Sequence, residues 1–188
     1  MKKLSNLMLS ANFLSTLFYS MSYPYIYAET LKAVPKGYIS FEQILQCVGT
    51  VILCAVWNRY SDRLFRYYGL FLWLEITADT ILFADVIIRN NLQFYFLLNV
   101  VIYAVITKNL ICGGTKMRAV VHDSQTLRER YDNNSNIVNS AASLLGAGIS
   151  VLFQISITSL FVLAFAGNII DNVFYLYIYS ELKRSDRN

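Results

Sequence analysis

The 188-residue sequence has few charged side chains, only three cysteines and a single histidine. Charged residues make up 15% of the chain, whereas soluble domains contain about 25%. Disorder is excluded as well, because 56% of the residues are hydrophobic and 15% are aromatic. Three cysteines are too few, and odd in number, for a disulfide scaffold. His122 stands outside any cluster of metal-ligand residues. The remaining class is an integral membrane protein.

What the chain does contain is a series of apolar segments. At about 30 residues for a span and its connection, the length suits six helices. Serine, asparagine and tyrosine interrupt most segments, which is typical of helices that pack on each other around a polar interior. We therefore predict an all-α integral membrane protein, a six-transmembrane-helix bundle that forms one domain over residues 1–188. The predicted spans are 5–27, 39–57, 69–88, 92–112, 135–153 and 155–178.

The placement of the basic residues predicts the orientation. If the six segments cross alternately, all of the 16 Lys and Arg except Lys32, Lys36 and Arg89 fall on one side. The positive-inside rule places that side, with both termini, in the cytoplasm. Residues 26–28 loosely resemble a signal-peptidase site, but cleavage there would leave five spans and put the basic loops outside. We expect an uncleaved protein of the cell membrane.

The longest predicted connection is the polar stretch between spans four and five, residues 114–134. Its apolar residues recur at helical spacing, so we expect a short amphipathic helix within a cytoplasmic loop. These apolar positions are Met117, Val120, Val121 and Leu127.

The connection between spans two and three, residues 57–69, carries the most informative motif, WNRYSDRLFRYYG. It resembles the signature loop of the major facilitator superfamily: a glycine, two variable residues, a small residue, then Asp-Arg-x-Gly-Arg-Arg. The matching residues are Ser61, Asp62, Arg63 and Arg66, and the departures are Asn58, Phe65 and Tyr67. The resemblance implies that Asp62, Arg63 and Arg66 form a cytoplasmic latch between two halves of a transporter. The alternative is a basic loop that follows the positive-inside rule, with Asp62 as a helix cap.

A weaker resemblance lies between spans four and five, where Arg118 and the pair Glu129-Arg130 are similar to elements that the family carries there. Together, the six spans and their loops resemble the N-terminal half of such a transporter. A complete member has two six-span halves with the substrate site between them. The resemblance therefore implies alternating-access transport of a small molecule with a second half, from a homodimer or another six-span segment. The alternatives are a non-transporting immunity or substrate-capture subunit and an inactive truncated transporter.

Ionisable residues within predicted spans are functional candidates by default. Glu75 and Asp79 lie one turn apart in span three and so share a helix face. Lys108, in span four, lies at a similar depth to Glu75, so a structural Glu75–Lys108 ion pair is the competing interpretation. Asp79 is the best candidate for proton coupling or substrate contact. Asp85 and Asp171 lie nearer the span ends and are expected at the interface.

Span five carries a face of small and polar residues, which in a membrane is either a packing surface or the wall of a wet cavity. Asn139 and Ser143 of this face, with Asn12 of span one, are our candidates for substrate contact. The full face is Asn136, Asn139, Ser140, Ser143, Gly146, Ala147, Ser150 and Gln154.

Other function classes find no support in the sequence. There is no phosphate-binding glycine loop, nucleophile elbow or HExxH motif. We therefore expect no enzyme, no cofactor, no metal and no nucleic-acid partner. The expected partners are membrane lipids, a small-molecule substrate and a second six-span half; the sequence indicates neither the substrate nor the direction of transport.

Overall fold

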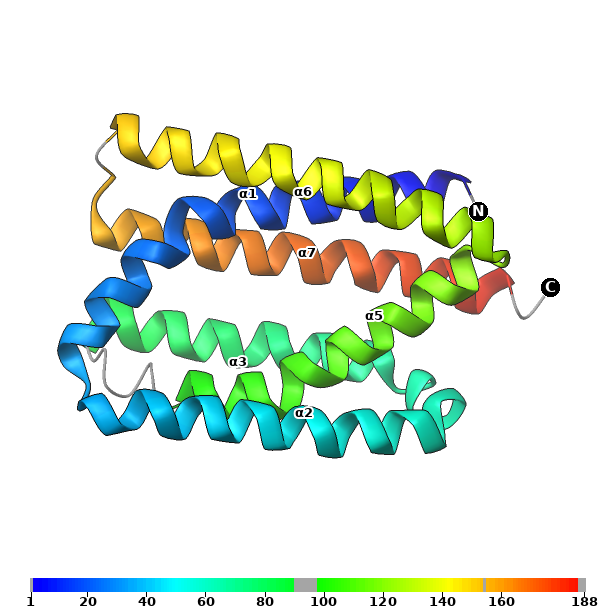
Figure 1. Cartoon of the computed structure of the whole chain (residues 1–188), viewed down its shortest axis with the longest axis horizontal. Coiled ribbons are helices and arrows are strands. Elements are labelled where there is room, and N and C mark those ends of the chain that lie inside the picture. The colour runs from blue at the N-terminus through cyan, green and yellow to red at the C-terminus, as the bar shows by residue number, and fades with distance from the viewer. Residues whose placement is uncertain (1, 90–97, 154, 186–188) are drawn as a thin grey trace. The chain divides into compact units, whose positions relative to one another are not determined.

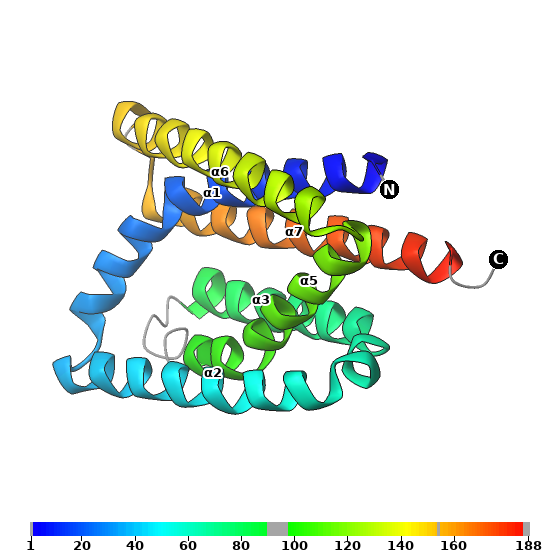
Figure 2. The same ribbon diagram turned by 45° about the vertical axis from the view of Figure 1, so that its right-hand side comes forward.

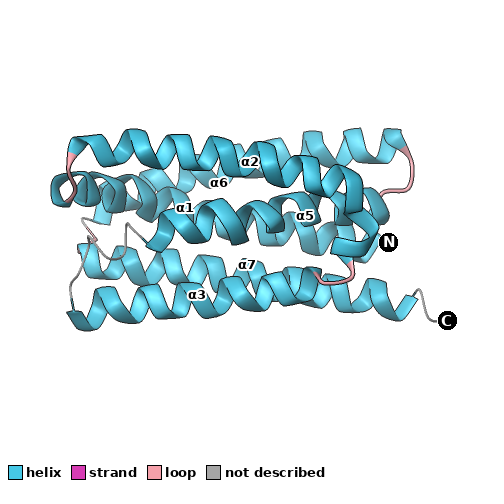
Figure 3. Ribbon diagram, turned by 90° about the horizontal axis from the view of Figure 1, so that it is seen from below, coloured by secondary structure: helices cyan, strands magenta, loops and turns pink. Residues whose placement is uncertain are grey.

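The computed structural model describes residues 2–89, 98–153 and 155–185, and all of its described elements are helices (Figures 1 and 3). The predicted all-α class is therefore confirmed for these residues. The helices are α1 (Lys2–Ala33), α2 (Lys36–Phe65), α3 (Tyr68–Arg89), α6 (Gln125–Phe153) and α7 (Ile157–Ser185). Between α3 and α6, the helix Leu98–Val121 contains the π-helical turn η1 (Tyr103–Thr107) and ends as α5 (Lys108–Val121). We call this element the 98–121 helix.

Four helices are long and apolar enough to cross a membrane, which makes this chain a candidate membrane protein by length and composition. The other two are α1 and α3, which lie where spans one and three were predicted. Serine and asparagine dilute the apolar residues of α1, and α3 carries Glu75, Asp79 and Asp85. Six spans therefore stay a prediction. The four candidate spans are Ser40–Phe65, Leu98–Val121, Gln125–Leu152 and Ile157–Ser185.

Several helices extend beyond the predicted span ends. Residues 114–134, where a separate short amphipathic helix was predicted, are mostly helical but belong to the end of α5 and the start of α6. Only residues 122–124 interrupt the helices there. The Ser124 hydroxyl accepts a hydrogen bond from the backbone N–H of Leu127, which begins α6. Arg128 donates to the carbonyls of His122 and Ala119 and so satisfies the end of α5. Hydropathy gauges only the apolar part of a helix, whereas these caps set where it begins and ends. The first residues of predicted span four, 92–97, lie outside the described part of the chain.

The chain was expected to be one domain, and its contacts divide it into two compact units. Unit 1 combines Met1–Pro24 with Met117–Asn188, and unit 2 is Tyr25–Lys116. The first boundary falls at Pro24, inside α1. Proline has no N–H to donate and clashes with the preceding turn, so a helix is easily bent there.

In unit 1, α1 packs against both α6 and α7 (Figure 2). Hydrogen bonds join Asn12 to Ser135, Thr16 to Asn139 and Ser20 to Ser143, and the partners are 123 residues apart in every pair. A constant offset means that α1 and α6 run in the same direction, in register. Along α7 the order is reversed, because Gly167 meets Phe18 and Tyr175 meets Asn12.

In unit 2, the 98–121 helix packs against both α2 and α3. Its partners on α2 follow the same order along both helices, so these two run in the same direction. The pairs are Gly49 with Ala104, Trp57 with Asn109, and Asp62 with Lys116. Its partners on α3 run in the opposite order: Tyr68 meets Leu110 and Gly113, and Glu75 meets Thr107. Each unit thus has one helix between a same-direction and an opposite-direction partner.

Gly146 is required for the close approach of α1 to α6, and this predicts a position-specific effect. A Cβ at Gly146 would lie 2.6 Å from the Leu17 carbonyl oxygen, whereas a Cβ at Gly148 meets nothing within 4 Å. We expect Gly146→Ala to lower the free energy of unfolding by about 1–3 kcal/mol. Gly148→Ala, the matched control, should leave it unchanged or raise it by up to about 1 kcal/mol. Unfolding of the purified protein in detergent, followed by circular dichroism, measures both; equal stability would contradict the packing.

Candidate functional site

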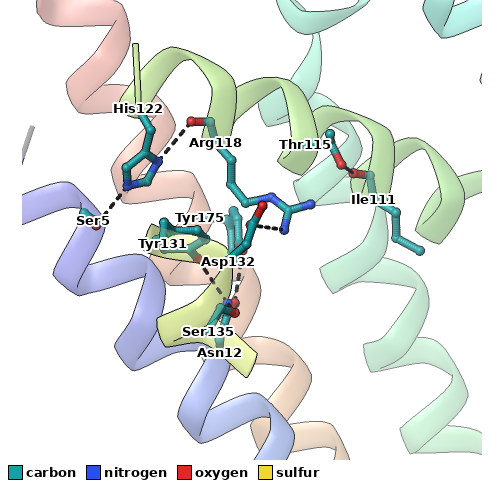
Figure 4. A network of polar contacts seen from close by, with 10 residues as sticks. All are labelled: Ser5, Asn12, Ile111, Thr115, Arg118, His122, Tyr131, Asp132, Ser135 and Tyr175. Atoms are coloured by element: carbon teal, nitrogen blue, oxygen red, sulfur yellow. Dashed lines mark hydrogen bonds and ion pairs between the residues drawn. The ribbon is translucent and has the colours of Figure 1, made fainter. Parts of the chain in front are cut away.

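The most connected polar group in unit 1 is the Asn12 side chain (Figure 4). Its amide nitrogen donates to the Tyr131 hydroxyl at 3.1 Å and to the Ser135 hydroxyl at 3.0 Å. Its oxygen accepts a hydrogen bond from the Tyr175 hydroxyl at 3.2 Å. Both amide protons are therefore used, which fixes the orientation of the group. Asn12 links α1 to α6 and to α7 in one turn of helix.

Asp171, on α7, lies one turn before Tyr175 and is hydrogen-bonded to Ser15 of α1. Its Oδ1 is buried and has no hydrogen-bond partner among the described residues. Asp171 was expected nearer a span end, at the membrane interface; that location stays a prediction, but its place along the helix differs from the expected one. Since α7 runs from Ile157 to Ser185, Asp171 is the middle residue of its 29. The sequence placed the end of the span at residue 178, because the polar residues that follow hide the continuation of the helix.

Further along the α1–α6 contact, Thr16 donates to Asn139 at 3.3 Å and Ser20 to Ser143 at 3.2 Å. The candidate residues Asn12, Asn139 and Ser143 therefore belong to one line of contacts. Packing, the competing interpretation of the span-five face, accounts for these residues and for Gly146. It does not account for Asn136 and Ser140, which are exposed on α6. Gln154 lies outside the described residues.

His122 is buried at the end of unit 1, 6% exposed, although it follows α5 in a short non-helical segment (Figure 4). Its Nδ1 lies 3.1 Å from the Arg118 carbonyl, which can only accept, so Nδ1 carries the proton. Its Nε2 lies 3.0 Å from the Ser5 hydroxyl, and its ring packs against Tyr131. Arg118 pairs with Asp132 at 3.7 Å. No pattern in the sequence indicates this burial, because it depends on where α1 lies.

The candidates Glu75, Asp79 and Lys108 lie in unit 2. The Glu75 side chain is buried and accepts a hydrogen bond from Thr107 at 2.7 Å. Lys108 lies over the Tyr103 ring, 4.8 Å from its centre, so the Glu75–Lys108 ion pair that we considered is absent between these described residues. Asp79 is half-buried, one turn beyond Glu75.

The family-like motif is helical, where a loop was predicted, because α2 continues to Phe65. Tyr60 interrupts the helical geometry, with φ −127° and ψ 25°. Asp62 follows this break and pairs with Lys116 at 2.8 Å, while its own side chain stays 85% exposed. Asp62 lies in the last turns of α2, where a carboxylate does not cap a helix N-terminus. Arg63 and Arg66 are exposed.

The described residues hold no group of three or more metal-ligating side chains. Comparison of the chain with protein-family models, with curated proteins and with solved structures found no match. The polar contacts of each unit are therefore the basis for any functional proposal.

Asn12→Ala should destabilise unit 1 because it leaves three hydroxyl groups without their partner. We expect the free energy of unfolding to fall by about 1–3 kcal/mol. Asn6→Ala is the control, since Asn6 is exposed on the same helix and should change stability by no more than about 0.5 kcal/mol. Thermal unfolding in detergent reports both, and equal losses would show that the network adds no stability.

Proposed function

We propose that this chain forms one six-helix half of a transporter that moves a small molecule across the membrane by alternating access, similar to the major facilitator superfamily. The observation that carries the proposal is the same helix arrangement in both units. In each, one helix packs between a same-direction partner and an opposite-direction partner.

The chain order of these partners supports the proposal further. The first helix, α1, has the fifth (α6) and sixth (α7) as its partners, whereas the fourth, the 98–121 helix, has the second and third. Helices one to three form one set and helices four to six the other. The first helix of each set packs against the second and third helices of the other set. If every helix crosses the membrane, the first and fourth cross in opposite senses. That is the pattern of inverted three-helix repeats nested within each half of such transporters.

The candidate residues take separate roles under this proposal. Asp62, Arg63 and Arg66, on the end of α2, would serve as the cytoplasmic latch, and the Asp62–Lys116 pair would tie that end to the 98–121 helix. The carboxylates Glu75 and Asp79 would serve coupling or substrate contact, since ionisable groups within spans mark ion or substrate paths. A second half, from another copy or another six-span segment, would complete the substrate site.

The exposed polar residues of α6 provide a test that needs no known substrate. Lipid does not solvate polar side chains, so the exposed Asn136 and Ser140 need contact with water or with another protein segment. In protein whose cysteines Cys47, Cys54 and Cys112 are replaced by alanine, we expect Ser140→Cys to react with a membrane-impermeant maleimide in proteoliposomes. Val51→Cys is the control, because Val51 is 70% exposed on the apolar face of α2 and should face lipid without reacting.

The two outcomes separate transport from other roles. A transporter should also show a change in the Ser140→Cys labelling rate when a proton gradient is imposed, because alternating access changes which side the residue faces. If Ser140→Cys is as unreactive as Val51→Cys, the proposal that α6 lines a water-filled cavity is contradicted. A labelling rate that no gradient or solute changes favours a non-transporting subunit.

The need for a second half predicts the oligomeric state. We expect native mass spectrometry of the protein, released from lipid nanodiscs, to give the mass of two 21.5 kDa chains or of one chain with a second membrane protein. A strictly monomeric chain from its native membrane, with no partner, would contradict this part of the proposal.

A further inference from the structure

Asp171 combines three structural features that the proposed transport function does not use. It is the midpoint of α7, its carboxylate faces Ser15 of α1, and its Oδ1 is buried without a hydrogen-bond partner among the described residues. An ionised carboxylate in such a position is unfavourable unless a positive charge neutralises it. The question is which positive charge the surroundings can supply.

Among the described residues, the groups around Asp171 supply no positive charge. The partner from α1 is the neutral Ser15, and Asn12 on the same helix uses its oxygen on Tyr175. On α7 itself Tyr175 interacts with Asp171, and Tyr131 of α6 interacts in turn with Tyr175. Both are neutral phenols at physiological pH.

The charged groups nearby belong to a separate pair. The guanidinium of Arg118, on α5, acts on Tyr175 and Tyr131 and is paired with Asp132 at 3.7 Å. No lysine, arginine or histidine of the described residues pairs with Asp171. A bound ligand can supply the neutralising charge that the described residues lack.

We propose that Asp171 is a proton-binding site, whose carboxyl group takes up a proton between α1 and α7. A proton needs only the single unpartnered oxygen, whereas a metal ion needs several oxygen ligands directed at one point. The Asn12 oxygen accepts from Tyr175, and the Ser15 hydroxyl donates to the Asn12 backbone carbonyl at 3.3 Å. Both groups are thus already engaged in hydrogen bonds within the protein. The site stands independently of transport; only its use in coupling rests on the proposed function.

Infrared spectroscopy tests this directly, because a protonated carboxyl group has a C=O stretch distinct from that of a carboxylate. The full chain is placed in lipid nanodiscs at pH 5, in water and in D₂O, with choline chloride as the salt. We expect a protonated-carboxyl band in the wild type that Asp171→Asn loses and Asp123→Asn retains, since Asp123 is exposed. Ser15→Ala should keep the band at a shifted frequency, because its hydrogen-bond partner is lost. Raising the pH should convert the band into the carboxylate signal.

Two results would overturn the proposal. If the spectra of wild type and Asp171→Asn coincide in the protonated-carboxyl region, Asp171 is not protonated. If replacing choline chloride with sodium chloride at constant pH removes the band, Asp171 binds a sodium ion and not a proton. If circular dichroism shows that Asp171→Asn has lost helical content, Asp171→Glu is measured instead. We expect Asp171→Glu to shift the frequency of the protonated-carboxyl band. An unchanged band in a folded Asp171→Glu protein again excludes Asp171.

Discussion

The close packing of α1 on α6 is the contact on which the rest of unit 1 depends. Inside a membrane, water does not drive apolar helices together, so van der Waals contact and interhelical hydrogen bonds hold them. Gly146 lets α6 approach the α1 backbone at Leu17, and at that separation Asn12, Thr16 and Ser20 reach their partners. A slip of one residue would turn the α1 face by about 100° and break every pair.

The same packing creates the chemistry of unit 1. Because α1 lies between α6 and α7, one turn of it brings Asn12 to hydroxyl groups on both neighbours and Ser15 to Asp171. The Asp171 Oδ1 is buried without a hydrogen-bond partner among the described residues, whereas Arg118 pairs with Asp132. In unit 2, the 98–121 helix has the equivalent place, and there Thr107 holds Glu75. Each unit therefore buries an acidic group against the helix that packs between the other two.

Sequence patterns predicted the helices better than their ends. Long apolar segments predict α2, α6 and α7 because a buried helix needs apolar residues along its length. They do not predict where the helix stops in polar sequence. This explains why most of the motif around Asp62 is helical, and why residues 114–134 extend α5 and α6 instead of forming a separate short helix. The caps at Ser124 and Arg128 are local, yet an arginine that folds back onto carbonyls of the preceding helix is visible only in three dimensions.

Sequence alone predicted the helical class, the apolar composition of a membrane protein and the face of span five that holds Asn139 and Ser143. Each of these follows from composition or from helical periodicity within one segment. Three-dimensional packing sets which helix that face meets, that Glu75 pairs with Thr107 and not with Lys108, and that the Asp171 Oδ1 is buried at the middle of α7. These depend on contacts between segments up to 163 residues apart, such as Tyr175 and Asn12, and no local pattern encodes them.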